Sequence, residues 1–345
     1  MGLMGLMGLM GLMGCSMIDE DQSDCESEEM AAMNYEMRLV TNMELEINAQ
    51  LSTRVDLNLA QALRAYLMNV FSDYAHDVDL SFYDTSGDSV RLQHDQHIMD
   101  AYQASYTLNL PMRHYMHLAA ANLKNNDQVG LVNDAYCHPS MLQQVSRDTI
   151  DSHSTGLFTA RQPIAIQKGI SQVFNVHLYM ANCAAMLVVD PRGYDTTGMK
   201  VYTTGFATGF NLCDSSFVYP SQSPIVNTTL LGLDNGSDEI GFCSVTFPSR
   251  NPETRTVIET EEPFISKESS EGLWEFRVYV PHYSTDNTTS VTETILRIHK
   301  PLKAGQLMII KGWLDGQGAF NTKDKTVGVS VTLDWNKNQE HEVPL

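Results

Sequence analysis

Basic residues are scarce in this chain of 345 residues, which has 22 lysines and arginines against 42 acidic residues and a formal net charge of −20. A field of that sign repels phosphate backbones, and no cluster of basic residues interrupts it, which excludes nucleic acid as a partner. After residue 14 no apolar run reaches the ~18 residues that a membrane-spanning helix needs. Charged residues are only 19% and apolar residues 43% of the chain. These proportions exclude disorder for the body and, at about 150 residues per domain, predict two folded domains.

Motifs that carry catalysis or bind a cofactor are also missing. The six cysteines form no Cys-x-x-Cys pair, so neither a zinc ribbon nor a thioredoxin-type site is indicated. No glycine-rich phosphate loop occurs. Residues 87–90 (Gly-Asp-Ser-Val) weakly resemble a serine-hydrolase block, but they fall in an expected hairpin turn and not at a strand-to-helix elbow. The sequence therefore predicts no enzyme and no cofactor.

Histidines and acidic residues give only weak metal signals. His94 and His97 have a spacing that fits one face of a helix, whereas His114 and His117 fall in an expected strand, which would put their rings on opposite faces. Neither pair has an obvious third ligand, so we interpret them as solvent-facing or edge histidines and predict no metal site. A surface calcium site in the acidic loop 234–239 stays open as an alternative, because carboxylate oxygens suffice for that ion.

The first fourteen residues form an uncharged Met-Gly-Leu repeat that ends at Gly14, directly before Cys15. An apolar segment with a small residue before a cysteine is typical of a lipoprotein signal, so we expect 1–14 to be a signal peptide and Cys15 to carry the lipid. The usual basic start is absent, since the first basic residue is Arg38. Residues 15–33 are acidic and predict a solvated tether. Lipidation of Cys15 would leave five cysteines and at most two disulfides, whose pairing the sequence does not reveal.

Alternation of apolar and polar residues dominates the body of the chain and predicts strands. Over 35–47 it indicates one long strand, or two joined strands, with one buried face, and over 327–335 it is cleanest. The apolar positions of these two segments are Tyr35, Met37, Leu39, Met43, Leu45 and Ile47, and Val327, Val329, Val331, Leu333 and Trp335. Similar patterns predict strands within 78–82, 106–110, 115–121, 173–180, 186–189 and 274–280.

One helix interrupts the strands. Leu59, Leu63, Leu67 and Val70 recur on one face of a helix, with Asp56 or Asn58 as its cap. Short strands with turn punctuation and no alternation of strands with helices favour an all-β fold of antiparallel sandwiches. We expect an N-terminal β-sandwich at 34–165 and a C-terminal one at 166–345.

Several stretches resemble a known family. Residues 293–312 (ETILRIHKPLKAGQLMIIKG) followed by 327–335 (VGVSVTLDW) are the most specific; Cys15, 18–21 (IDED), 23–25 (SDC), 38–43 (RLVTNM), 77–84 (DVDLSFYD) and 174–183 (FNVHLYMANC) agree. Together they resemble the fimbrial anchoring subunits of Bacteroidota type V pili. The resemblance implies two transthyretin-like antiparallel β-sandwich domains in tandem, no enzyme activity, a lipid on Cys15, and a place at the base of a fimbrium on the outer membrane.

The resemblance also implies assembly by β-strand addition, in which a strand of one subunit completes the sheet of its neighbour. Stalk subunits of that family lose their own first strand to open the groove. Here the 35–47 strand follows the lipid closely, so its removal would cut the anchor. We therefore expect 35–47 to stay in place and close its own sandwich, and 327–335 to contact fimbrial stalk subunits. A tip adhesin of the same pilus type and a glycan-binding surface lipoprotein are the alternatives.

Overall fold

The computed structural model describes residues 29–41, 43–71, 75–98, 105–124, 126–132, 135–168, 171–232, 238–251, 273–283 and 289–334. The first half of the chain holds β1 (Met30–Val40), α1 (Met43–Arg54), α2 (Leu57–Val70), β2 (Asp77–Asp84), β3 (Arg91–Ile98), β4 (Ser105–Pro111), β5 (His114–Ala121), β6 (Val129–Val132), β7 (Met141–Gln144), β8 (Thr149–Ile150), β9 (Phe158–Ala165) and β10 (Gln172–Met180). The second half holds β11 (Cys183–Asp190), β12 (Lys200–Thr204), β13 (Gly209–Asn211), β14 (Ser216–Val218), β15 (Ile225–Asn227), β16 (Thr229–Leu231), β17 (Ile240–Thr246), β18 (Trp274–Tyr283), β19 (Thr289–Ile298), β20 (Leu307–Leu314), β21 (Phe320–Thr322) and β22 (Val327–Asp334). The all-β prediction is confirmed, with a second helix beside the expected one.

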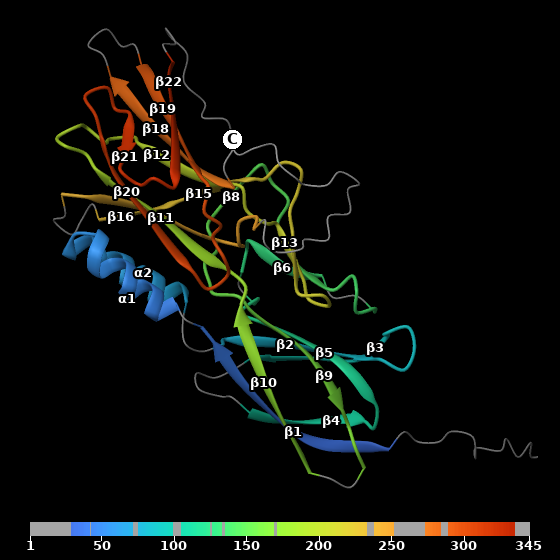
Figure 1. Ribbon diagram of the computed structural model, residues 1–345. Helices are drawn as coiled ribbons and strands as arrows, with labels where there is room; N and C mark the ends of the chain where they lie inside the picture. The colour runs from blue at the N-terminus through green and yellow to red at the C-terminus, as the bar shows by residue number, and fades with distance from the viewer. Residues whose placement is uncertain are drawn as a thin grey trace, which may run out of the picture.

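A seven-stranded sheet, ordered β3-β2-β5-β9-β10-β1-β4, forms the first sandwich (Figure 1). Among the described residues β9 and β10 pair at only two positions, Tyr179 with Thr159 and Met180 with Phe158. Side chains of β1 and β5, which are not neighbours in the strand order, nevertheless touch. The sheet therefore folds over at the β9–β10 corner, and the β10-β1-β4 layer covers the β3-β2-β5-β9 layer.

The second sandwich stacks a five-stranded sheet, β16-β17-β11-β20-β21, on a six-stranded sheet, β22-β19-β18-β12-β15-β8. Trp274, Phe276, Val278 and Val280 alternate inward along β18 and are all at most 1% exposed. Strand β11 is buried along its length from Cys183 to Val189. Both of its faces are covered, one by the core of this sandwich and the other by the two helices.

Both helices pack on the five-stranded sheet, against β16, β17 and β20, although they follow β1 in the chain (Figure 1). The predicted apolar face of α2 is confirmed, since Leu59, Leu63, Leu67 and Val70 are all buried. Gly241 of β17 leaves room for this contact, because a Cβ there would clash with Met186 Cε and lie 3.0 Å from Leu59 Cδ1. Of the two predicted caps, Asp56 is the one used: its carboxylate accepts from the Asn58 N–H at 3.1 Å.

The predicted strand over 35–47 is wrong beyond Val40. The strand ends there, and α1 begins at Met43, with the Met43 N–H donating to Thr41 Oγ1 at 3.1 Å. Met43 and Ile47, four residues apart, are at most 1% exposed, whereas Leu45 between them is 70% exposed. Met43 and Ile47 fit both the alternation of a strand and the four-residue spacing of a helix, so the alternation that continues from β1 hid the start of a helix. Leu45 and Ile47 are therefore helical residues.

A four-stranded sheet, β14-β13-β7-β6, packs over the outer face of β2 and β5. Its strands come from both sides of residue 165, as do those of the β1–β10 and β8–β15 pairs. The proposed division into 34–165 and 166–345 is crossed by these pairings. Where the chain divides into domains stays a prediction.

Candidate strand-assembly site

Strand β1 lies between two partners inside the first sandwich. It pairs in parallel with β10 from Met33–Gln172 to Val40–Tyr179 and antiparallel with β4 from Met30–Pro111 to Glu36–Ser105. Both backbone edges of β1 are thus used, and the strand is the centre of the β10-β1-β4 layer. Without it, β4 would lose its described sheet partner and β10 would gain an open edge.

Side chains of β1 alternate as the sequence predicts. Met33, Tyr35 and Met37 are buried at 2, 0 and 7% exposure, and Leu39 is half-buried. The intervening residues of the strand face solvent. Burying side chains of this size stabilises the fold by about 2 kcal/mol each. Tyr35, Met37 and Leu39 therefore lie on the central strand of the β10-β1-β4 layer, and their role in strand assembly stays a prediction.

Tyr35 reaches across the sandwich to a buried histidine on β5. Its hydroxyl lies 2.8 Å from His117 Nε2, and His117 Nδ1 lies 3.1 Å from the Ser81 carbonyl oxygen. Since a carbonyl only accepts, Nδ1–H donates to Ser81 and Nε2 accepts from the Tyr35 hydroxyl. The Tyr35 ring stacks on Tyr106 of β4 with centroids 5.3 Å apart, and His117 stacks on Phe82 at 4.4 Å. This chain of contacts joins the central strand of one layer to two strands of the other.

Burial controls the charge of this pair. It lowers the pKa of His117 to about 4 and raises the pKa of the Tyr35 hydroxyl above its usual value. Both groups are therefore neutral at pH 7. The interpretation of the histidines as solvent-facing is wrong for His117, which is 0% exposed, while His114 three residues earlier is exposed. His94 and His97 lie on strand β3, so the predicted helical face is also wrong.

Strand β22 has the opposite environment. It pairs with β19 from Val327–Ile298 to Asp334–Val291 and ends the order of its sheet, so its second edge has no strand partner in the described chain. Val329 and Val331 lie opposite Leu296 and Thr294, whose side chains are buried, and so point to the inner face.

Val329 and Val331 nevertheless lie at the rim of the sandwich, on the edge strand of its six-stranded sheet. Val329 is 43% and Val331 47% exposed, because the opposing sheet covers them incompletely. The strand prediction is confirmed for β22, but full burial of its apolar face is not. Trp335 and the side chain of Leu333 lie outside the described residues. An open backbone edge beside partly exposed valines is an arrangement that can accept an added strand.

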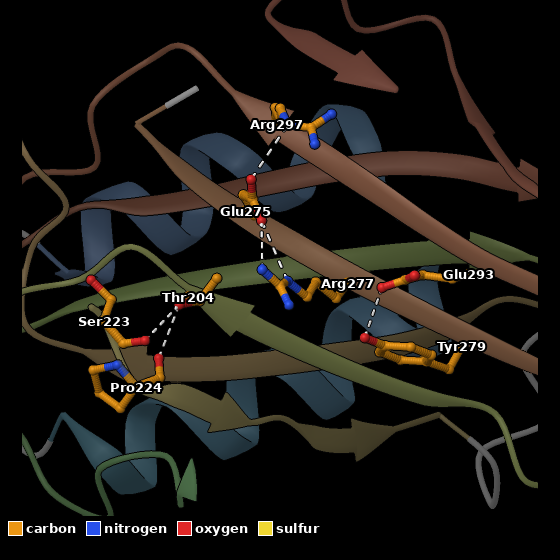
Figure 2. A network of polar contacts seen from close by, with 8 residues as sticks. All are labelled: Thr204, Ser223, Pro224, Glu275, Arg277, Tyr279, Glu293 and Arg297. Carbon is orange, nitrogen blue, oxygen red and sulfur yellow. Dashed lines mark hydrogen bonds and ion pairs between the residues drawn. The ribbon is translucent and has the colours of Figure 1, made fainter. Parts of the chain in front are cut away.

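The outer face of the same sheet carries a polar network (Figure 2). Glu275 accepts from Arg277 on its own strand and pairs with Arg297 on β19, each nitrogen 3.4 Å from a carboxylate oxygen. Tyr279 donates to Glu293 Oε1 at 2.8 Å. These contacts tie β18 to β19. Each acidic group has a basic or hydroxyl partner, which suits a structural role.

The remaining motifs form no chemical site among the described residues. Residues 87–90 lie in the turn region after β2, as predicted. No group of three or more potential metal ligands occurs there, and neither helix is long and apolar enough to cross a membrane. In the acidic loop 234–239, residues 234–237 lie outside the described residues, and Glu239 pairs with Lys311. Trp274 is buried and Trp313 lies under the Arg192 guanidinium, 4.3 Å from the ring centre.

Comparisons with known proteins found similar structures only. No family model and no curated protein matches the chain. A proposed polysaccharide-binding protein from Bacteroides thetaiotaomicron is 10% identical, with 90% of this chain and 99% of that chain covered and a TM-score of 0.52. A proposed adhesin from Bacteroides ovatus is 11% identical, with 92% and 99% covered and a TM-score of 0.50. The fimbrial anchor protein Mfa2 from Porphyromonas gingivalis is 8% identical, with 89% of this chain and 99% of that chain covered and a TM-score of 0.44. The chain thus has the fold of these Bacteroides proteins.

Proposed function

We propose that the chain is a non-enzymatic, lipid-anchored subunit of a cell-surface fimbrium, which holds the fibre to the outer membrane and ends subunit assembly there by β-strand complementation. One observation carries the proposal: β1 is paired along both edges inside its own sandwich. A subunit whose own strand fills this place has no vacancy for a neighbour's strand. It therefore ends a chain of subunits that join by strand addition.

The position of β1 in the sequence supports the membrane end of the fibre. Met30 follows Cys15 by fifteen residues, so proteolysis that removed β1 would also separate the body from the expected lipid. Cys15 itself lies outside the described residues. A mature chain that keeps its lipid anchor must therefore also keep β1.

The open edge of β22 is the proposed contact to the first stalk subunit. Addition of a strand there would satisfy the outer backbone groups of β22 and cover Val329 and Val331. Hydrogen bonds along the backbone would supply affinity, and the two valines would select side chains of the added strand.

Mass spectrometry of the mature protein tests the proposal. We expect a mature chain that begins at an acylated Cys15 and contains all of β1. Cys15→Ala should release the protein from membranes, whereas the matched variant Cys25→Ala should stay bound. A mature chain that begins after Val40, or a Cys15→Ala protein that remains on the membrane, would contradict the anchor.

A tip adhesin is the second candidate, favoured by the shared fold with a proposed adhesin. Immunogold labelling separates the two roles. Label at the membrane-proximal ends of fimbriae supports the anchor, and label confined to distal ends supports the adhesin. A pull-down with the intact chain tests the glycan-binding alternative. An anchor or a tip adhesin should capture stalk subunits, whereas a glycan-binding lipoprotein should not.

A further inference from the structure

Two of the four described cysteines lie in neighbouring loops of the four-stranded sheet. Cys137 precedes β7, and Cys213 follows β13, which pairs with β7. The ladder between these strands continues past their ends, since the Leu212 N–H donates to the Ser140 carbonyl at 3.0 Å. The Asn211 amide also donates to the His138 carbonyl at 2.8 Å. The two loops are therefore held side by side.

Both cysteines are free thiols in the structure and face the same interior. Cys137 and Cys213 are 1% and 8% exposed and belong to one buried cluster under the four-stranded sheet. Cys213 is near enough to contribute, after burial, to raising the pKa of the Cys137 thiol. A disulfide needs two cysteines whose backbones lie close together, and the hydrogen bonds that join these two loops bring Cys137 and Cys213 near each other.

The other two described cysteines are arranged differently. Cys243 is opposite Met186 in the β11–β17 ladder, whereas Cys183 is opposite Thr246. Cys183 faces the core of the second sandwich, and Cys243 faces the helices. They lie on opposite faces of one sheet, so they cannot bond without rearrangement and serve as internal controls.

We propose that Cys137 and Cys213 form a disulfide in the mature protein, while Cys183 and Cys243 remain free thiols. The oxidant is an external disulfide. The thiolate of one cysteine attacks it and forms a mixed disulfide with release of one thiol. The other cysteine then displaces the second thiol, so that two protein thiols are oxidised and one external disulfide is reduced. In cells this rests on the proposed function, because export supplies an oxidising compartment.

The burial of Cys137 indicates when the proposed disulfide would form. Burial, with the neighbouring Cys213, raises the pKa of Cys137 to about 12, so few thiolates exist at neutral pH once the chain has folded. The bond is therefore expected to close during folding. Between these cysteines the chain runs through β9, β10, β11 and β12, which belong to both sandwiches. The bridge would thus restrict the unfolded chain over a long loop.

The test uses the purified full chain, refolded from a reduced, unfolded state in oxidised and reduced glutathione. After alkylation and digestion without reductant, we expect a linked Cys137–Cys213 peptide and alkylated Cys183 and Cys243. Reductant should lower the midpoint of thermal unfolding by about 5–10 °C. This shift should vanish in Cys137→Ser and Cys213→Ser and persist in Cys183→Ala.

Alkylation of both Cys137 and Cys213 after oxidative refolding, or a bridge from either one to Cys25, would overturn the proposal. The same digestion of protein taken from cells separates it from the proposed function. A bridge that forms on refolding but is absent in cells supports the pairing and contradicts an exported location. A bridge in both samples supports both.

Discussion

Strands β1 and β22 carry the same alternation of apolar and polar residues, yet they have opposite environments. Met33, Tyr35 and Met37 of β1 are buried, and both of its backbone edges are paired, in parallel with β10 and antiparallel with β4. In β22 two of the alternating valines are nearly half exposed, and one backbone edge has a described partner. Among the described residues, β1 is paired along both edges, whereas β22 is paired along one edge only.

The difference shows that alternation predicts which face of a strand is buried but does not predict what lies at its two edges. Faces are set by side chains along the strand itself. Edges are set by whichever strands the fold brings alongside, and for β1 these come from residues 105–111 and 172–180. The comparison predicts that perturbing β1 damages the fold, whereas perturbing β22 damages only assembly.

Removal of β1 should have the largest effect. A chain that begins at Thr41 loses three buried side chains, on the order of 6 kcal/mol, together with both ladders. We expect the first sandwich to become susceptible to limited proteolysis, while α1, α2 and the second sandwich persist. A synthetic peptide of residues 29–41 should restore protection.

The peptide itself supplies the controls. One that carries Tyr35→Phe should bind about tenfold more weakly, because His117 Nε2 would be buried without its donor. A peptide of the same composition with apolar and polar positions exchanged should not bind. Equal protease resistance with and without β1 would contradict the central role of the strand.

Acid should loosen the first sandwich through His117. Its folded-state pKa is about 4 against 6.5 in the unfolded chain, so the unfolded state binds the extra proton. Neutral His117 therefore leaves the free energy of unfolding undiminished above pH 6.5. As the pH falls from 6.5 to 4, protonation of this histidine in the unfolded chain lowers the free energy of unfolding by about 3 kcal/mol. His117→Gln, which keeps a hydrogen-bonding side chain without this titration, should flatten the loss.

His114→Gln is the matched control, since His114 is exposed on the same strand. Urea unfolding at several pH values measures both variants. The control should retain the dependence of the parent protein. Buried His153, with a pKa lowered to about 3, keeps some acid sensitivity in each of them. An unchanged pH profile in His117→Gln would remove this histidine as the cause.

Lysines on β22 should have the smallest effect on stability. The double variant Val329→Lys/Val331→Lys replaces exposed side chains, so the free energy of unfolding should change by about 0.5 kcal/mol or less per site. Binding of the stalk partner should fall at least tenfold, because charges at an edge oppose strand addition. Val173→Lys, at a 49% exposed position on β10, is the control that should bind normally.

Much of the fold could be predicted from local patterns. Alternation located β2, β4, β5, β10, β18 and β22, and the four-residue repeat of leucines located α2. The failures have particular causes. Met43 and Ile47 fit the period of a strand as well as that of a helix, so the pattern predicts a strand where α1 begins. The sequence around His117 does not reveal its buried hydrogen-bond partner, because the Tyr35 hydroxyl comes from 82 residues earlier in the chain.

Sequence by itself determined the acidic charge, the strand-rich composition and which face of each strand is apolar, because these depend on residues close together in the chain. The three-dimensional fold was needed to learn that β1 is paired on both edges and β22 on one edge in the described chain, that Tyr35 meets His117, and that Cys137 and Cys213 share a buried cluster. Each of those outcomes depends on contacts between residues distant in sequence. The backbone edges involved look alike until their partners are in place.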